Sequence, residues 1–276
     1  MTSATLAPAS SGTTVQKVTG LRVLRSEWAK FWSLRSSWIT LSVGVVLLIA
    51  FGAIASATYS PDAATNQGPG PNSGVSDAVS LALTGVTFAS LAVGVLGVLL
   101  SAGEYSTGMI RSTLAAVPRR LPVLWAKSAV IGPIALILTT IAALAAFQLG
   151  TLGLDGEKIA LSLSDDGVLR SLTGAGVYLA LVAVFGVALG MLLRSSAGAI
   201  AALVGILLIL PGLASLLPDS LYDNINPYFP SNAGSAVYAL QQSSDSLSPG
   251  AGLAVFAGWV ALTLAGAAFR LVRTDA

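Results

Sequence analysis

Six apolar runs without any Asp, Glu, Lys or Arg constrain the fold of this 276-residue chain more than any other feature. Each run has about 20 residues, the length that an α-helix rising about 1.5 Å per residue needs to cross about 30 Å of hydrocarbon. Only 9% of the residues are charged, whereas about 25% are charged in soluble domains. The sequence therefore predicts an all-α, polytopic membrane protein with six transmembrane helices, at residues 39–58, 79–100, 128–149, 172–193, 197–217 and 251–269.

The segment before the first run has two parts. Residues 1–20 are rich in Ser, Thr and Ala and are predicted to be a disordered cytoplasmic tail, and residues 21–276 form the six-span domain. No short apolar segment follows a basic start, as a signal peptide requires, so we expect the N-terminus to be retained. Pro133 and Pro211 fall inside the third and fifth runs and are expected to kink those helices.

Lys and Arg gather on one side of the predicted membrane, and basic loops are retained in the cytoplasm during insertion. The opposite connections hold nine of the 12 acidic residues. Both termini are therefore expected in the cytoplasm. That side carries 12 of the 14 basic residues: Lys17, Arg22, Arg25, Lys30, Arg35, Arg111, Arg119, Arg120, Lys127, Arg194, Arg270 and Arg273.

This orientation has a direct test, because the chain contains no cysteine. We expect an impermeant thiol reagent added outside the cell to label a cysteine introduced at Ser73, between the first and second runs. The same reagent should not label a cysteine introduced at Ser112. The reverse labelling pattern would overturn the orientation.

An amphipathic segment precedes the first run. Its apolar residues recur at helical spacing and basic residues occupy much of the remaining surface, which is typical of a helix lying in the membrane interface. We expect this N-terminal interfacial helix to anchor the entry to the first span, and it is also a candidate for contact with another subunit. The apolar residues are Leu21, Leu24, Trp28, Phe31 and Leu34, and the others assigned to the helix are Arg22, Arg25, Lys30 and Trp32.

The connection between the second and third runs is too long and too patterned for a tight turn. Met109, Ile110, Leu114 and Val117 form one apolar edge at helical spacing, and Pro118 would end a short helix because it lacks a backbone donor. Two interpretations stay open from the residues alone. The connection is either a docking element for a soluble partner or a solvated loop whose arginines follow the positive-inside rule.

The order of these features resembles the ABC-2 type transporter permeases, particularly those of actinobacteria, over nearly the whole chain. The resemblance is carried by the entry LRVLRSEWAKFWSLRSSW, the six spans and the connection EYSTGMIRSTLAAVPRRLPVLWAK. The connection is the more specific of the two motifs and resembles the family's coupling-helix region. The resemblance implies a short cytoplasmic coupling helix between spans two and three, with Glu104, Gly108, Arg111, Pro118 and Arg119 as its coupling residues.

Residues 226–240, NPYFPSNAGSAVYAL, resemble the external segment before the last span of these permeases. In that segment, short helices partly re-enter the membrane. Ser231 or Asn232 is expected to cap such a helix, because hydroxyl and amide side chains accept hydrogen bonds from the first free backbone N–H groups.

The resemblance also implies a function. Two six-span subunits, identical or different, would form a pathway in the bacterial plasma membrane, and each would rest on a cytoplasmic ABC ATPase subunit that binds ATP and Mg²⁺. This chain has no Gly-x-x-x-x-Gly-Lys-[Ser/Thr] phosphate loop. We therefore expect a permease without enzymatic activity, cofactor, metal site or nucleic-acid partner. Its expected cargo is a hydrophobic or amphipathic compound, such as a drug, antibiotic, peptide or lipid, moved outward.

Glu104 is the charged residue on which the coupling hypothesis depends most. We expect it to pair with Arg111 or with another cytoplasmic base and so to hold the connection against the helix ends. The alternative is a solvated charge at the rim, whose ion pair would contribute about 0 to 1 kcal/mol.

Other functions are constrained by composition. Without His and Cys, the serine–histidine, thiolate and familiar zinc mechanisms cannot be assembled. A secondary transporter remains an alternative, although such proteins usually carry ionisable residues within their spans, and the predicted spans have none. A non-transporting membrane anchor or sensor also remains, and stimulation of a partner's ATP turnover would distinguish a permease from it.

Two small-xxx-small pairs lie in the predicted spans. Gly186 with Gly190 and Ala201 with Gly205 permit close helix contact, and we expect both pairs to pack helices within one subunit.

Overall fold

The computed structural model describes residues 19–60, 77–117, 120–154, 157–242 and 246–273, and every regular element in these ranges is helical. The predicted tail lies mostly outside the described residues, and the first helix already begins at Gly20. In chain order the elements are α1 (Gly20–Ser33), α2 (Arg35–Ala57), α4 (Ala78–Ala82), α5 (Val86–Ser106), α6 (Met109–Ala116), α7 (Leu121–Gly153), α8 (Val168–Leu193), α9 (Ser196–Val204), the π-helical η1 (Gly205–Ile209), α10 (Leu210–Ala214), α11 (Asp219–Ile225), the 3₁₀ turn η2 (Asn226–Tyr228), α12 (Pro230–Tyr238) and α13 (Pro249–Arg273).

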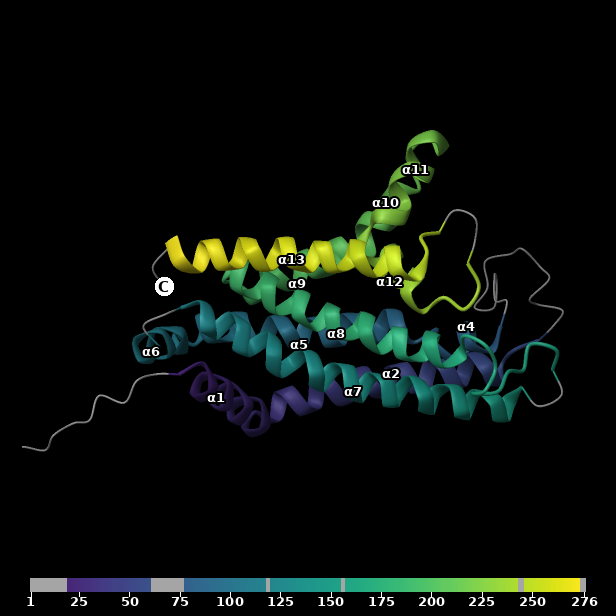
Figure 1. Cartoon of the computed structure of the whole chain (residues 1–276), viewed down its shortest axis with the longest axis horizontal. Helices are drawn as coiled ribbons and strands as arrows, with labels where there is room; N and C mark the ends of the chain where they lie inside the picture. The colour runs from purple at the N-terminus through teal and green to yellow at the C-terminus, as the bar shows by residue number, and fades with distance from the viewer. Residues whose placement is uncertain (1–18, 61–76, 118–119, 155–156, 243–245, 274–276) are drawn as a thin grey trace, which may run out of the picture.

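Six helical segments of the described chain are long and apolar enough to cross a membrane, which confirms the predicted number. They are α2, α5, α7, α8, the composite of α9, η1 and α10, and α13. The helix α8 packs against α5, α7 and α13 and forms the centre of the bundle (Figure 1). In its most apolar stretch 67% of the residues are buried, against 22% in both the fifth and the sixth span.

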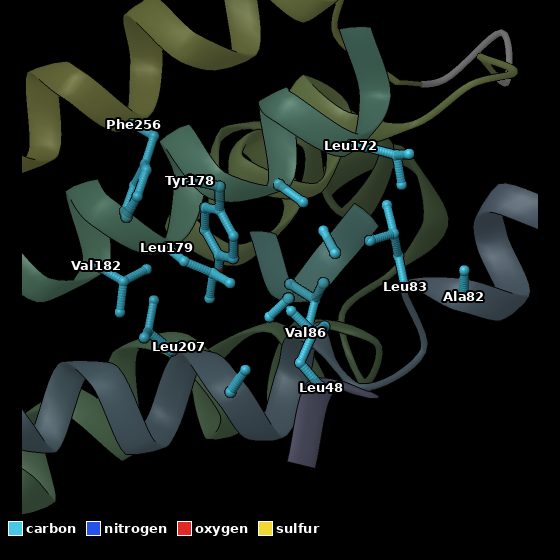
Figure 2. Close-up of a cluster of buried hydrophobic side chains, with 14 of the residues drawn as sticks. Leu48, Ala82, Leu83, Val86, Leu172, Tyr178, Leu179, Val182, Leu207 and Phe256 are labelled. Carbon is cyan, nitrogen blue, oxygen red and sulfur yellow. The ribbon is translucent and has the colours of Figure 1, made fainter. Parts of the chain in front are cut away.

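The apolar core gathers around α8. Leu179 and Val182 of α8 meet Phe256 of α13, Val86 of α5 and Leu48 of α2 in one buried cluster (Figure 2). Apolar or small residues occupy every side of α8, as expected for a helix enclosed by other helices.

The contact between α5 and α8 depends on glycine. A Cβ atom added to Gly186 would lie 2.1 Å from the carbonyl oxygen of Gly94, and one added to Gly97 would lie 2.1 Å from the carbonyl oxygen of Ala183. Gly190 packs equally closely against α5. The backbones therefore touch, and the prediction that Gly186 and Gly190 pack helices within one subunit is confirmed.

The second small-residue pair, Ala201 and Gly205, is not packed closely against another described helix. Ala201 is exposed, and no atom lies within 4 Å of a Cβ added to Gly205. The expectation that this pair packs against another helix of the same subunit is wrong for the described residues. Ala201 lies on α9 and Gly205 starts η1, and the open space beside Gly205 leaves no close helix contact there.

The second span begins later than predicted. Its first apolar residues form the separate short helix α4, which Asp77 caps, and the chain turns before α5 starts at Val86. Gly85, in this turn, lies so close to α2 that an added Cβ atom would stand 2.6 Å from the carbonyl oxygen of Leu48. The start of the span is set by this tertiary contact, which hydropathy does not report. The helix α5 thus differs from the predicted run 79–100 at both ends, since it starts at Val86 and continues to Ser106.

The third and fifth spans also differ from their predicted bounds. The helix α7 is 33 residues long and continues through Pro133 as one helix. The fifth span ends at Ala214, and its π-helical turn η1 lies directly before Pro211. Proline lacks a backbone donor and clashes with the carbonyl four residues earlier, so the regular α-helix is interrupted there. The helices α10 and α11 then project away from the other helices (Figure 1).

The short helix α12 packs against α8 and α13, at the end of the bundle opposite α1 and α6 (Figure 1). Phe229 is its N-cap residue and no side chain caps it, so the predicted cap by Ser231 or Asn232 is wrong. Asn232 instead donates to the backbone carbonyl of Asn226 at 2.9 Å. Arg170 donates to two backbone carbonyls at the C-terminal end of α12, where the helix dipole favours a cation.

Candidate functional site

The helices α1 and α6, the last turn of α5, the first turns of α7 and the C-terminal end of α13 lie at one end of the bundle (Figure 1). We call it the basic end, because these segments hold most of the described Lys and Arg residues. The acidic residues described in these segments are Glu27 and Glu104, and both are buried. Buried carboxylates require compensating positive charges or hydrogen-bond donors.

Four charged side chains form a closed cluster at the basic end. Lys127 Nζ lies 2.7 Å from Glu27 Oε2 and 2.6 Å from Glu104 Oε1. Lys30 Nζ lies 2.7 Å from Glu27 Oε1 and 3.0 Å from Glu104 Oε1. Each lysine therefore bridges both carboxylates. We call Glu27, Lys30, Glu104 and Lys127 the ion-pair quartet.

The quartet joins helices that are far apart in the sequence. Glu27 and Lys30 belong to α1, Glu104 to the last turn of α5 and Lys127 to α7. Lys127 also donates to the backbone carbonyl of Leu100 at 3.0 Å. Lys30 reaches the hydroxyl of Thr113 on α6 at 3.5 Å, so the cluster contacts the fourth helix of the basic end as well.

The quartet is largely withdrawn from solvent. The side chain of Lys127 is 3% exposed, that of Glu27 6% and that of Glu104 9%, whereas that of Lys30 is 23% exposed. Burial lowers the pKa of Lys30, but the hydrogen bonds and negative charges of Glu27 and Glu104 outweigh burial and raise this pKa above its ordinary value. Lys30 therefore stays charged at neutral pH and continues to balance the two carboxylates.

Sequence reasoning missed Glu27 and Lys127. Val23, Glu27 and Phe31 follow one another at intervals of four residues, which places them on one helix face, and all three are buried. This spacing was the available signal that an acidic residue lies on the buried face of α1. The sequence places Lys127 only among the cytoplasmic basic residues, and its burial follows from the extension of α7 toward the basic end.

The predicted coupling residues lie in different environments. Glu104 pairs with two bases of the basic end rather than with Arg111, and its burial excludes the alternative of a solvated rim charge. Gly108 precedes α6 with φ +73°, a backbone conformation that glycine adopts without strain. Arg111 is exposed on α6. Pro118 and Arg119 lie outside the described residues.

The predicted apolar stripe of α1 does not coincide with its buried face. Of the stripe, Phe31 is buried, but Leu21 and Trp28 are 60% and 48% exposed. The buried face is the one that contains Glu27. Trp28 and Trp32 instead form an exposed aromatic pair with ring centroids 5.7 Å apart, and the predicted Arg22 and Arg25 are exposed between these faces. The helix therefore presents apolar side chains on two sides.

The helix α6 lies beside α1 with a cavity between them. Its predicted apolar edge is divided, because Ile110 is buried whereas Met109 is 47% exposed. The cavity between α1 and α6 has a volume of about 340 Å³ and is lined by Ser26 and Thr113 among others. A second cavity of about 360 Å³ lies on the other side of the quartet, against the start of α2.

The quartet can fix the relative positions of helices. Separating it would leave charges buried without partners, which is strongly unfavourable. The quartet therefore favours joint movement of α1, α5 and α7 at the basic end. The helix α6 is connected to α5 through Gly108, whose backbone has the left-handed conformation.

No protein-family model matches the chain, and no curated protein shows significant similarity to it.

Proposed function

We propose that this chain is the membrane-spanning permease subunit of an ATP-binding-cassette transporter of the ABC-2 type. In this proposal it lies in a bacterial plasma membrane with the basic end in the cytoplasm. A separate ATPase subunit binds ATP and Mg²⁺ and supplies the energy, and the permease exports a hydrophobic or amphipathic compound. The permease itself performs no chemical reaction.

The observation that carries the proposal is the ion-pair quartet together with α6. A short helix of eight residues, Met109–Ala116, lies at the basic end and leads directly from α5. The quartet ties the last turn of α5 to α1 and α7, and Lys30 also reaches α6 through Thr113. A displacement of α6 would therefore be transmitted to several spans at once, which is what a coupling helix has to do.

The mechanism follows from this mechanical connection. Closure of the ATPase around ATP would displace α6, and the rigid corner formed by α1, α5 and α7 would move with it. The ATP-bound partner can drive this change only if it binds the two permease states with different affinity. In the proposal, α1 is the interfacial helix, and its exposed Trp28 and Trp32 lie at the headgroup boundary, which suits amphipathic rings.

A second permease subunit completes the proposed assembly. The fifth and sixth spans are the least enclosed, with 22% of their most apolar stretches buried. Ala201 is exposed on the fifth span, Gly205 is half-buried with open space around an added Cβ, and such small residues would permit close approach of another helix. The partner is either a second copy of this chain or a different permease.

A secondary transporter and a membrane anchor are the competing functions. The buried charged residues described within the long helices, Glu104 and Lys127, lie in mutual contact at the basic end. A pair at this position is suited to holding helices together, whereas a coupling-ion site is usually near the middle of the membrane. An anchor would not stimulate ATP turnover by a partner, whereas a permease would.

The test uses a single cysteine at Ser112, an exposed position on α6, in a chain that otherwise has none. We expect light crosslinking in native membranes, followed by purification through a C-terminal tag, to capture a soluble subunit with a phosphate-binding loop. That subunit should hydrolyse ATP faster when it is bound to the chain and a transported compound is present. Arg111→Glu should weaken both the crosslinking and this stimulation, because it reverses a charge beside Ser112.

The matched control is a single cysteine at Ser164, which is exposed in the connection before α8. It should capture no such subunit. If the Ser112→Cys chain folds but captures only itself or other membrane proteins, the coupling proposal fails and the anchor or secondary transporter becomes the better hypothesis.

A further inference from the structure

Three tryptophans form a cluster where α1 passes into the first span. The rings of Trp28 and Trp32 on α1 have centroids 5.7 Å apart, and the ring of Trp38 on α2 lies 4.3 Å from that of Trp32. Trp28 and Trp32 are 48% and 51% exposed. None of the three indole N–H groups donates to another described residue. This tryptophan cluster therefore presents apolar ring faces and hydrogen-bond donors outward.

An arginine flanks the tryptophan cluster on each helix. Arg25 precedes Trp28 by three residues on α1, and Arg35 precedes Trp38 by three residues on α2, a spacing that places each pair side by side. Both arginines are exposed. The described part of α1 and α2 holds one acidic residue, Glu27, which is buried within the ion-pair quartet. The exposed surface around the cluster therefore combines positive charge with donors and lacks a carboxylate from these two helices.

An exposed aliphatic strip continues from Arg35 along α2. Ile39 and Val46 follow Arg35 by four and eleven residues, so they share its helix face, and they are 64% and 61% exposed. Because α2 is a membrane span, this strip lies at the depth of the acyl chains. The tryptophan cluster lies at the start of the span, at the headgroup boundary. The surface thus carries positive charge, then rings, then aliphatic side chains, in the order in which a phospholipid carries its headgroup, glycerol and acyl chains.

We propose that this surface binds anionic phospholipid in preference to zwitterionic phospholipid. The phosphate groups are bound by Arg25 and Arg35, the glycerol region lies against the tryptophan rings, and the acyl chains follow the aliphatic strip. A guanidinium group suits phosphate because it donates two parallel hydrogen bonds. Choline is attracted by aromatic rings through cation–π contact, but here it would lie beside two guanidinium groups. The inference requires only insertion in a membrane and is independent of a partner ATPase.

The aliphatic strip decides between a lipid and a soluble protein as the occupant. An acidic segment of a soluble partner would match the charge of Arg25 and Arg35. It would not reach Ile39 and Val46, which lie within the membrane span. A phospholipid matches the charged part and the apolar part of the surface together.

The test measures quenching of tryptophan fluorescence by brominated lipids in vesicles that contain the full chain. Trp125→Phe/Trp259→Phe leaves the three tryptophans of the cluster as emitters. We expect brominated phosphatidylglycerol to bind at the cluster about tenfold or more tightly than brominated phosphatidylcholine, since each arginine near the membrane surface contributes about fivefold. Added salt should reduce this preference. Equal quenching by both lipids, stronger quenching by the phosphatidylcholine, or protection from both, as a second copy covering the cluster would give, would overturn the proposal.

Arginine variants test the location. Arg25→Gln and Arg35→Gln should each reduce the preference for phosphatidylglycerol about fivefold, because each removes a phosphate contact. Glutamine is a good helix former, so both variants should fold. The matched control is Arg273→Gln, which removes one positive charge from an exposed position on α13, also at the basic end. It should change the preference less than about twofold, because charges away from the site are screened. An equal reduction in all three variants would show a response to net charge and would overturn the site.

The depth of the bromine atoms distinguishes a headgroup site from general contact with acyl chains. Tryptophan rings at the headgroup boundary lie nearer to the ester end of a lipid than to the end of its chains. Phosphatidylglycerol brominated near the ester should therefore quench the cluster more strongly than the same lipid brominated near the chain end. The opposite order would contradict the proposed pose.

Discussion

Lys127→Met is expected to reduce the free energy of unfolding by about 3 to 5 kcal/mol, the cost of leaving a buried charge without its partner. The side chain of Lys127 is 3% exposed and lies within 2.7 Å of both Glu27 and Glu104. Removal of its charge would leave two buried carboxylates that share only Lys30. The loss is measurable by SDS titration in mixed micelles, followed by the fluorescence of the five tryptophans.

Two controls separate the electrostatic effect from loss of packing. Lys30→Met makes the same change in a side chain that is 23% exposed, so water can partly replace the ammonium group and the loss should be clearly smaller. In the double variant Glu104→Gln/Lys127→Met, one charge of each sign is removed together. Its loss should be smaller than the sum of the two single losses, because each single variant leaves an unbalanced charge. Equal losses for Lys30→Met and Lys127→Met would contradict a buried quartet.

Gly186→Val should destabilise the protein by about 3 kcal/mol or more, at the upper end of what overpacking costs. Even the first added carbon would lie 2.1 Å from the carbonyl oxygen of Gly94 and 3.2 Å from the backbone nitrogen of Val98. Both neighbours are backbone atoms of α5, so they cannot rotate aside as a side chain would. The helices would have to separate, and the apolar contacts around α8 would be lost.

The measurement is again SDS titration, with Gly258→Val as the matched control. Gly258 lies on a membrane span with no atom within 4 Å of an added Cβ, so its replacement should change the free energy of unfolding by less than about 1 kcal/mol. A Gly186→Val chain as stable as the control would show that α5 and α8 are not in backbone contact.

The sequence predicts the spans well because length and apolar composition are local properties. The ends of the spans are less predictable. Residues of α4 are as apolar as those of α5, and only the contact of Gly85 with the backbone of α2 reveals where the two helices part. The extension of α7 by several residues was hidden because Lys127 appeared to mark the limit of an apolar run.

The candidate site was partly predictable for a related reason. The sequence marks Glu104 as a coupling residue, but its partners Lys127 and Lys30 lie 23 and 74 residues away along the chain, and spacing in the sequence does not report such contacts. Glu27 is not predicted, because the apolar pattern of α1 indicates a helix with one apolar stripe. Its exposed tryptophans and its buried glutamate lie on different sides, and only tertiary packing distinguishes the two.

The composition of the quartet has an electrical consequence. With all four groups ionised, two ammonium groups balance two carboxylates, so the cluster carries no net charge. A single unbalanced charge that crossed the membrane would exchange about 2.3 kcal/mol with a potential of 100 mV. The quartet, displaced as a unit, would exchange none. The quartet itself is therefore expected to contribute nothing to any dependence of these movements on membrane voltage.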